Sequence, residues 1–212
     1  MATGAVANPN VAEHLAIKLT QMIEARREDL IALTQELIQI PTVNPPGNNY
    51  LEICEYLERR LTSKGFQVQL IRASGALGDS DQFPRWNVVA RYDGGSSGDC
   101  VHFNSHTDVV EVGRGWTVDP FGGELKDGKI YGRGACDMKG GLAASIIAAE
   151  AFLELCPKFA GAVEISGTAD EETGGYGGVA YLAEKGFFAP ERVQHVIIPE
   201  PLNKDRICLG HL

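Results

Sequence analysis

Hydrophobic and polar positions follow a helical period over several stretches of the chain. Between residues 11 and 40, apolar side chains recur every three or four positions until Pro41, which predicts one long helix or two shorter ones. Residues 50–64 resume the same period. The small apolar side chains of residues 140–155 predict a helix packed tightly on a sheet, and residues 179–185 predict a shorter helix.

Short apolar runs between these helices have the length and composition of strands. They lie at residues 66–71, 86–92, 101–105, 162–168 and 193–198, and one more begins at residues 207–209. We expect the neighbouring strands at 86–92 and 101–105 to form a hairpin. The alternation of strands and helices predicts an α/β fold, in which a mixed, mostly parallel sheet is flanked by helices on both faces.

The intervening segments are predicted turns and loops. Residues 42–49 contain two prolines and a glycine, and residues 73–83 are rich in Gly, Ser and Asp. Residues 109–126 contain Gly, Pro and Trp without a clear period, which indicates a surface loop capable of lining a pocket. No repeat, low-complexity tract or linker divides the chain into two domains.

Composition and charge narrow the possible partners. An apolar content of 44% in 212 residues is enough for a real core. The net charge of -9 would repel phosphate backbones, and no Lys/Arg-rich stripe offsets it, so no nucleic-acid partner is expected. Residues 1–10 have neither a basic flank nor an apolar core, so we expect no secretory signal, no membrane anchor and a cytoplasmic protein.

The five cysteines are scattered and form no Cys-x-x-Cys pair. Neither a disulfide framework nor a thiolate zinc site is therefore predicted, and buried reduced thiols are expected. Cys136 is the exception to watch, because it directly precedes Asp137.

Candidate chemistry lies where four predicted strands or turns end. These places hold one imidazole and five carboxylates, those of His106, Asp108, Asp137, Glu171, Glu172 and Glu200. Like charges held a few ångströms apart cannot all stay ionised without a cation between them. If the strand ends converge, the sequence predicts a site for divalent metal.

The spacing within the stretches suggests a division of roles. His106 and Asp108 are two positions apart, so on an extended chain both point to one side, and the carboxylate can hold the imidazole while the imidazole holds metal. Of the adjacent Glu171 and Glu172, one can bind metal while the other remains free to accept a proton.

Each residue also has an ordinary structural interpretation. His106 can be an interior histidine, Asp137 a helix N-cap, and Glu200 a turn residue, while Asp108 can cap a loop and residues 170–172 can form a solvated acidic loop. A nucleotide-binding module is a further alternative, because residues 175–180 fit Gly-x-Gly-x-x-Ala. The preceding acidic residues would crowd a pyrophosphate with negative charge, and the chain contains neither a phosphate-loop motif nor a Gly-x-Ser-x-Gly elbow.

Taken together, the stretches resemble a known family from about Glu28 to the end of the chain. Residues 105–110, 131–140 and 170–172 are similar, in order and spacing, to motifs of the dinuclear zinc amidohydrolases and exopeptidases. That family contains acetylornithine deacetylase, succinyl-diaminopimelate desuccinylase, aminoacylase and glutamate carboxypeptidase. Residues 119–121 also resemble its loop between the first two motifs.

The resemblance implies a zinc exopeptidase-like catalytic domain and a role for each acidic residue. It implies two divalent metal ions, zinc in the first place with cobalt or manganese as alternatives. The implied roles are one metal held by His106 and Glu200, a bridge by Asp137, a second metal on Glu172, a general base at Glu171, and orientation of His106 by Asp108.

The resemblance also implies parts that this sequence does not contain. The family completes its second metal site with a histidine that follows an inserted lid domain, whereas this chain ends at Leu212. We therefore expect residues 1–212 to be the N-terminal portion of a metallohydrolase catalytic domain. The lid and dimerisation domain and the C-terminal catalytic segment are then expected to be absent from this chain. The C-terminal segment of the same protein is an expected partner of this chain, and the complete protein is expected to be a homodimer. His211 is a weak substitute for the missing ligand, and His14, His102 and His195 are expected to be packing or surface residues.

The expected function is hydrolysis of a C–N bond, most directly the amide of an N-acyl amino acid or a small dipeptide-like acid. Two alternatives stay open at this point. One is a metal-binding fragment or interaction domain without catalysis of its own, and the other is an aminohydrolase of a different C–N bond, such as that of an arylamine.

Overall fold

The computed structural model describes residues 9–202, and a five-stranded sheet of mixed direction forms its centre. Across the sheet the strands follow the order β1 (Gln67–Arg72), β2 (Trp86–Asp93), β6 (Phe159–Thr168), β3 (Gly95–His106) and β7 (His195–Ile197). Strand β2 is antiparallel to both of its neighbours, whereas β6, β3 and β7 are parallel, so all strands except β2 run the same way. The predicted mixed, mostly parallel sheet is confirmed.

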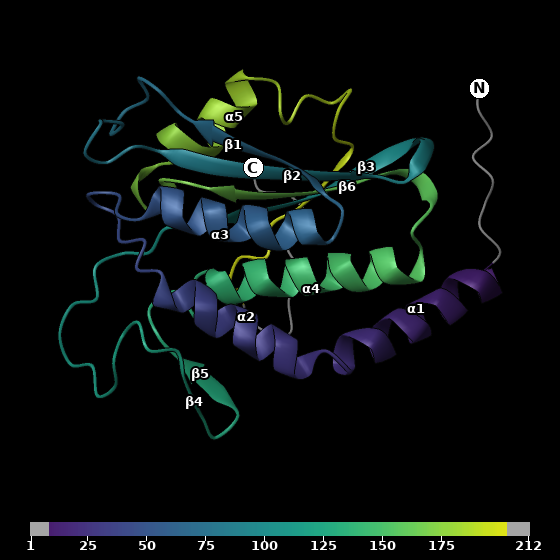
Figure 1. The fold of residues 1–212 in the computed structure, drawn as a ribbon, viewed down its shortest axis with the longest axis horizontal. Helices are drawn as coiled ribbons and strands as arrows, with labels where there is room; N and C mark the ends of the chain where they lie inside the picture. The colour runs from purple at the N-terminus through teal and green to yellow at the C-terminus, as the bar shows by residue number, and fades with distance from the viewer. Residues whose placement is uncertain (1–8, 203–212) are drawn as a thin grey trace.

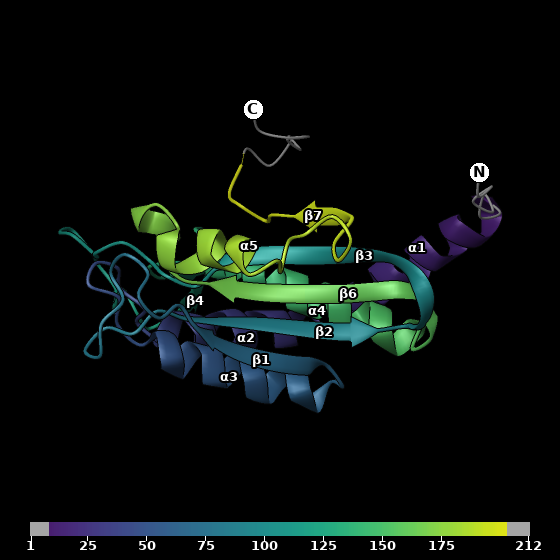
Figure 2. The same ribbon diagram turned by 90° about the horizontal axis from the view of Figure 1, so that it is seen from above.

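Helices cover the two faces of the sheet unequally. Helices α3 (Tyr50–Ser63) and α4 (Lys139–Leu155) pack directly on one face (Figures 1 and 2). Helices α1 (Pro9–Glu24) and α2 (Arg27–Gln39) pack on the outside of α4, so the predicted helical stretch is two helices. The opposite face carries the short helix α5 (Tyr181–Glu184) and the turn that precedes it.

The main core lies between the sheet and helices α2, α3 and α4. Each helix contributes one apolar stripe, as its sequence period predicts, and each long strand contributes every second side chain. Complete burial of an aliphatic side chain is worth about 1.5–3 kcal/mol, so this layer is the main source of stability. Its fully buried members include Leu33, Leu37, Leu57, Leu61, Val88, Leu142, Ile146 and Ile165.

The predicted hairpin of residues 86–92 and 101–105 is wrong. Strand β6 lies between β2 and β3, pairing antiparallel with the first and parallel with the second. Nearly all of β6 is buried, and a strand that is covered on both faces is most stable in the centre of a sheet. The local connection at Gly94 therefore joins two strands that do not pair with each other.

The predicted loop at residues 109–126 ends in a strand. Strand β4 (Glu124–Lys126) pairs with β5 (Lys129–Tyr131) across Asp127 and Gly128, whose φ angles are 50° and 73°. Two positive φ angles are typical of the tight turn that Asp-Gly favours. The predicted strand start at residues 207–209 lies outside the described residues.

The cysteine prediction is confirmed only for part of the set. Cys54 and Cys100 are buried free thiols, and Cys156 is half-buried. Cys136 is exposed, because it lies in the turn before α4 rather than on a core-facing strand or helix. Cys208 lies outside the described residues. None of the helices described is long and apolar enough to cross a membrane.

Candidate metal centre

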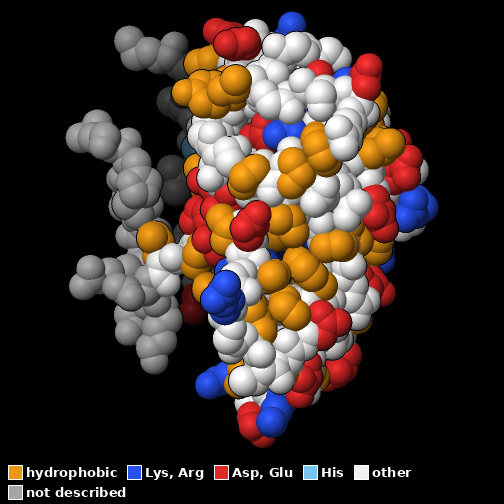
Figure 3. Space-filling view, turned by 90° about the vertical axis from the view of Figure 1, so that its left-hand side faces the viewer, with side chains coloured by type: hydrophobic (Ala, Val, Ile, Leu, Met, Phe, Trp, Pro, Cys, Tyr) orange, Lys and Arg blue, Asp and Glu red, His pale blue; other side chains and the backbone are white. Residues whose placement is uncertain are grey.

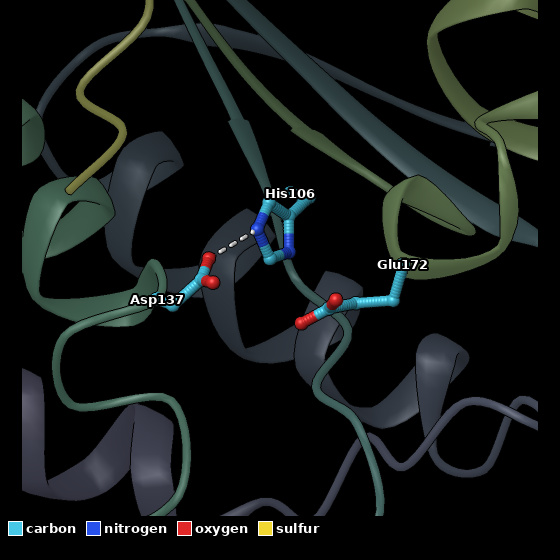
Figure 4. Close-up of side chains that lie close together, drawn as sticks. All are labelled: His106, Asp137 and Glu172. Carbon is cyan, nitrogen blue, oxygen red and sulfur yellow. Dashed lines mark hydrogen bonds and ion pairs between the residues drawn. The ribbon is translucent and has the colours of Figure 1, made fainter. Parts of the chain in front are cut away.

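The ends of two neighbouring parallel strands bring the acidic stretches together. His106 is the last residue of β3 and is in register with Thr168, the last residue of β6. The chain then turns into the 3₁₀ helix η1 (Glu171–Thr173). One ligand atom each of His106, Asp137 and Glu172 lies within 4.8 Å of the others (Figure 4).

The His106 ring is buried and held in one orientation. Its Nδ1 donates to the backbone carbonyl of Asp108 at 2.9 Å, while the Asp108 carboxylate lies farther away, at 3.5 Å. The carbonyl is therefore the closer support of the ring. With the proton on Nδ1, Nε2 faces the carboxylates and is the atom available to a metal.

Three carboxylates surround that Nε2 atom. Asp137 Oδ1 lies at 3.0 Å, Glu200 Oε1 at 3.6 Å, and Glu171 Oε2 at 3.8 Å. Residues from three separate segments of the sequence thus converge on one nitrogen. The sequence pattern anticipated this convergence.

The buried carboxylate of Asp108 has partners that the sequence did not indicate. It accepts hydrogen bonds from the backbone N–H groups of Glu171 and Glu172, both at 3.2 Å, and from Nδ2 of Asn44 at 2.9 Å. Asp108 therefore ties the loop that carries the two glutamates to the strand end that carries His106. Asn44 lies in a proline-rich turn with no metal-ligand motif, so only the three-dimensional structure reveals its part.

Asp137 does not cap helix α4. Met138 occupies the N-cap position without a side-chain cap bond. The Asp137 side chain is 55% exposed to solvent and points toward His106. Lys139, which the capping interpretation would leave on the surface, is completely buried and donates to the carbonyls of Leu37 and Ile40 at 2.8 and 2.7 Å. Burial lowers the pKa of Lys139 to about 7.

Glu200 reaches the cluster from the segment after β7. Its side chain is 34% exposed. Gly141 on the first turn of α4 makes this approach possible, because a Cβ atom there would collide with the carbonyl oxygen of Pro199. A residue without a side chain is therefore required where this segment crosses the helix.

The electrostatics of the cluster suit a bound cation. Burial raises the pKa of Glu172, and the neighbouring charge of Asp137 raises it further. Burial likewise raises the pKa of Glu200, with a smaller opposing effect of His106. For His106, burial alone would lower the pKa, but the hydrogen bond and charge of Asp108, followed by the charge of Glu200, raise it to about 9. The residues present therefore fit a divalent metal, which would replace that proton as the positive charge.

The other described histidines lie away from the cluster. His102 is buried, with Nε2 2.7 Å from the Ser166 hydroxyl. His195 is exposed and pairs with Asp99 at 3.2 Å, and His14 is also exposed. They are packing and surface residues, as expected, while His211 lies outside the described residues.

The loop after β3 is fastened close to the turn that bears Asp137. The Arg133 guanidinium lies over the Trp116 ring at 5.5 Å and donates to the carbonyl of Glu111 at 3.0 Å. Figure 3 views the end of the molecule toward which the tips of β3 and β6 point, where hydrophobic side chains lie among acidic ones. That this loop lines a substrate pocket stays a prediction.

The model of one protein family matches a large part of this chain. The match covers residues 102–210, slightly more than half of the sequence, and the family is described as peptidase family M20/M25/M40. The chain belongs to this family. The resemblance to a family of metal-dependent amidohydrolases and exopeptidases, predicted from the acidic stretches, is confirmed.

A curated relative and two solved structures agree with this membership. The chain is 38% identical over 181 residues to the succinyl-diaminopimelate desuccinylase of Methylorubrum populi, covering 84% of this chain and 44% of that protein. The structure of the dipeptidase Dug1p from Saccharomyces cerevisiae has a TM-score of 0.72 at 18% identity, covering 86% of this chain and 40% of that one. A Bacillus subtilis structure described as a dinuclear metal binding peptidase of the M20 family has a TM-score of 0.57 at 19% identity, covering 82% and 43%.

The relatives extend well beyond the region that they share with this M20 chain. The chain spans less than half the length of the curated relatives that it matches. The two structural neighbours show the fold alone at these identities. Family membership makes the chain part of a group of hydrolytic enzymes.

Proposed function

We propose that this chain carries the metal centre of a hydrolase that cleaves the amide C–N bond of small N-acyl amino acids or dipeptide-like acids. The observation that supports this most is the convergence of Asp137, Glu171 and Glu200 on His106 Nε2, at the strand ends of an M20-family fold. The name of the curated relative supports an acylated amino acid as substrate.

In this proposal the cluster holds two divalent metal ions. His106 and Glu200 would hold one, Asp137 would be shared by both, and Glu172 would hold the second. An imidazole with carboxylates suits zinc, cobalt or manganese, and we propose zinc. Support for a pair of ions comes from the family and from the printed description of the Bacillus subtilis neighbour.

The bound metal would polarise the scissile carbonyl and make a water acidic near neutral pH. The residues of this chain then move the proton and hold the geometry. Glu171 accepts the proton of the attacking water and returns it to the leaving amine. Two observations support this role: the Glu171 carboxylate lies 3.8 Å from His106 Nε2, beside the proposed metal, and its side chain is half exposed, so water can reach it. Asp108 orients His106 through its carbonyl and Glu171 through its carboxylate.

The complete protein is proposed to contain more than the 212 residues. Because the matched relatives are more than twice as long as the matched region, we propose that residues 1–212 are the N-terminal portion of the catalytic domain. The remaining ligand of the second metal, the lid domain and the homodimer contacts then come from further sequence. A cytoplasmic location is part of the same proposal.

Replacing the proposed base tests this function. We expect Glu171→Gln in the complete protein to keep its metal content and to lose about 10²–10⁴-fold of its turnover of N-succinyl, N-acetyl and dipeptide substrates. Glu184→Gln, an exposed glutamate on α5, is the matched control and should behave as wild type. Wild-type turnover by Glu171→Gln would remove Glu171 from the role of base. A metal-loaded complete protein inactive on every substrate would instead favour a binding domain.

A further inference from the structure

The side chain of Asp170 is buried and bonds to Tyr50 on helix α3 and to Arg85, the residue before β2, while the next two residues are the proposed base and metal ligand. Its Oδ1 accepts a hydrogen bond from the Tyr50 hydroxyl at 3.1 Å, and the same hydroxyl accepts one from the Asp170 backbone N–H at 2.9 Å. Its Oδ2 accepts a bond from Nε of Arg85 at 3.0 Å. One tyrosine therefore holds both the backbone and the side chain of Asp170.

Arg85 connects this aspartate to two other loops. Its Nη1 donates to the carbonyls of Pro46 and Phe83 at 2.7 and 2.8 Å, and the residue is only 5% exposed. The segment after the glutamates closes over this ion pair at Gly177, where a Cβ atom would lie 2.5 Å from both Arg85 Cγ and Asp170 Oδ2. A buried ion pair with this many hydrogen bonds is held in one geometry.

The network holds a backbone conformation that is uncommon for residues other than glycine. Asp170 has a φ angle of 62°, in the left-handed region, and there the chain turns from β6 into η1. Aspartate enters that region more readily than most residues other than glycine, and the bonds from Tyr50 and Arg85 hold Asp170 there. The turn also sets the direction in which Glu171 and Glu172 leave the strand.

We propose that Tyr50 and Arg85 are positioning residues for the metal centre, which act through Asp170. The inference rests on the proposed function, because it assigns Glu172 to metal and Glu171 to proton transfer. Asp108 holds the amides of the two glutamates from one side, and the Tyr50 and Arg85 pair holds the preceding residue from the other. Both sets of bonds are needed to direct the Glu172 carboxylate to the metal and the neighbouring Glu171 carboxylate to the water. Residues that support a metal ligand commonly contribute about 10–100-fold to metal affinity.

Two variants of the complete protein test the inference. Tyr50→Phe removes only the hydroxyl and keeps the ring that fills the core, and Arg85→Lys keeps the charge but removes the fork of donors. Tyr56→Phe is the matched control on the same helix, because its hydroxyl bonds Glu36 instead. Arg60→Lys is the second control, since Arg60 pairs with the buried Glu150 at 2.9 Å.

Two measurements give the outcome. Isothermal titration with Mn²⁺ and Zn²⁺ is expected to show about 10–100-fold weaker binding in Tyr50→Phe and Arg85→Lys, and unchanged binding in both controls. Amide hydrogen exchange is expected to accelerate over residues 169–178 in the two variants alone. If Arg85→Lys does not fold, Tyr50→Phe carries the test.

The failures of the inference and of the proposed function are distinguishable. Wild-type affinity and wild-type exchange in Tyr50→Phe overturn the inference and leave the metal centre intact. Weaker binding in Tyr56→Phe to the same extent also overturns it, because the loss would then not depend on Asp170. A wild-type complete protein that binds neither ion overturns the proposed function, and the inference with it.

Discussion

Metal binding is expected to release a proton from His106. In the metal-free chain the carboxylates of Asp108 and Glu200 raise the pKa of this imidazole to about 9, against the effect of burial. A metal ion can bind Nε2 only when that nitrogen carries no proton. At about pH 7.5 the ring is mostly protonated, so the metal must displace the proton before it can bind.

The size of the effect follows from the separation between the pH and the pKa. With a pKa of about 9, only about one ring in 30 is neutral at about pH 7.5, which weakens metal binding about 30-fold, or by ~2 kcal/mol. Because each lower pH unit reduces the neutral fraction about tenfold, affinity should rise about tenfold between about pH 6.5 and 7.5. The rise should stop near the pKa of His106, where the ring is neutral without the metal.

Isothermal titration in buffers with different ionisation enthalpies measures this proton directly. A plot of observed enthalpy against buffer enthalpy should have a slope of about one released proton at about pH 7.5. His195→Asn is the control, because that exposed histidine pairs only with Asp99 and should leave the slope unchanged. A slope of zero together with pH-independent affinity would refute the reasoning.

Three substitutions test the supports of the centre and the fold. Asp108→Asn replaces one of the two oxygens that accept from the backbone N–H groups of Glu171 and Glu172 with an NH₂ group, which cannot accept. The free energy of unfolding should therefore fall by about 1–3 kcal/mol in urea titration. Lys139→Met removes the ammonium donor from the buried carbonyls of Leu37 and Ile40, which keep only backbone bonds from the N–H groups of Ile40 and Thr42, and a loss of about 0.5–1.5 kcal/mol per lost bond is expected from the same titration. Leu57→Ala opens a cavity in the core and should cost about 2–5 kcal/mol without changing metal affinity. A Leu57→Ala cost near zero, or wild-type stability of either polar variant, would contradict these assignments.

The sequence predicts the members of the cluster because they obey a local rule. His106 and Glu171 follow apolar strands, and such strand ends meet at one edge of a mostly parallel sheet. Which strands are neighbours depends on contacts between distant parts of the chain. The position of β6 between β2 and β3 therefore cannot be predicted from local sequence patterns. The hairpin of β4 and β5 does have a local sequence signal, the Asp127-Gly128 pair. The prediction of a loop at residues 109–126 did not take this signal into account.

The supporting residues were not predicted for a different reason. Tyr50 and Arg85 lie 120 and 85 positions from Asp170 along the chain, in segments without metal-ligand spacing. A tyrosine at a helix start and an arginine before a strand are ordinary in sequence. Their importance comes only from the folded chain, which buries both against one aspartate.

The most direct test of the metal centre is a crystal structure of this chain soaked with zinc, with anomalous diffraction recorded at the zinc edge. We expect a strong anomalous peak bonded to His106 Nε2 and to an oxygen of Asp137, with Glu172 or Glu200 completing its ligands. A zinc-soaked crystal with no peak between these side chains, or with zinc only at other surface residues, would contradict the proposed centre.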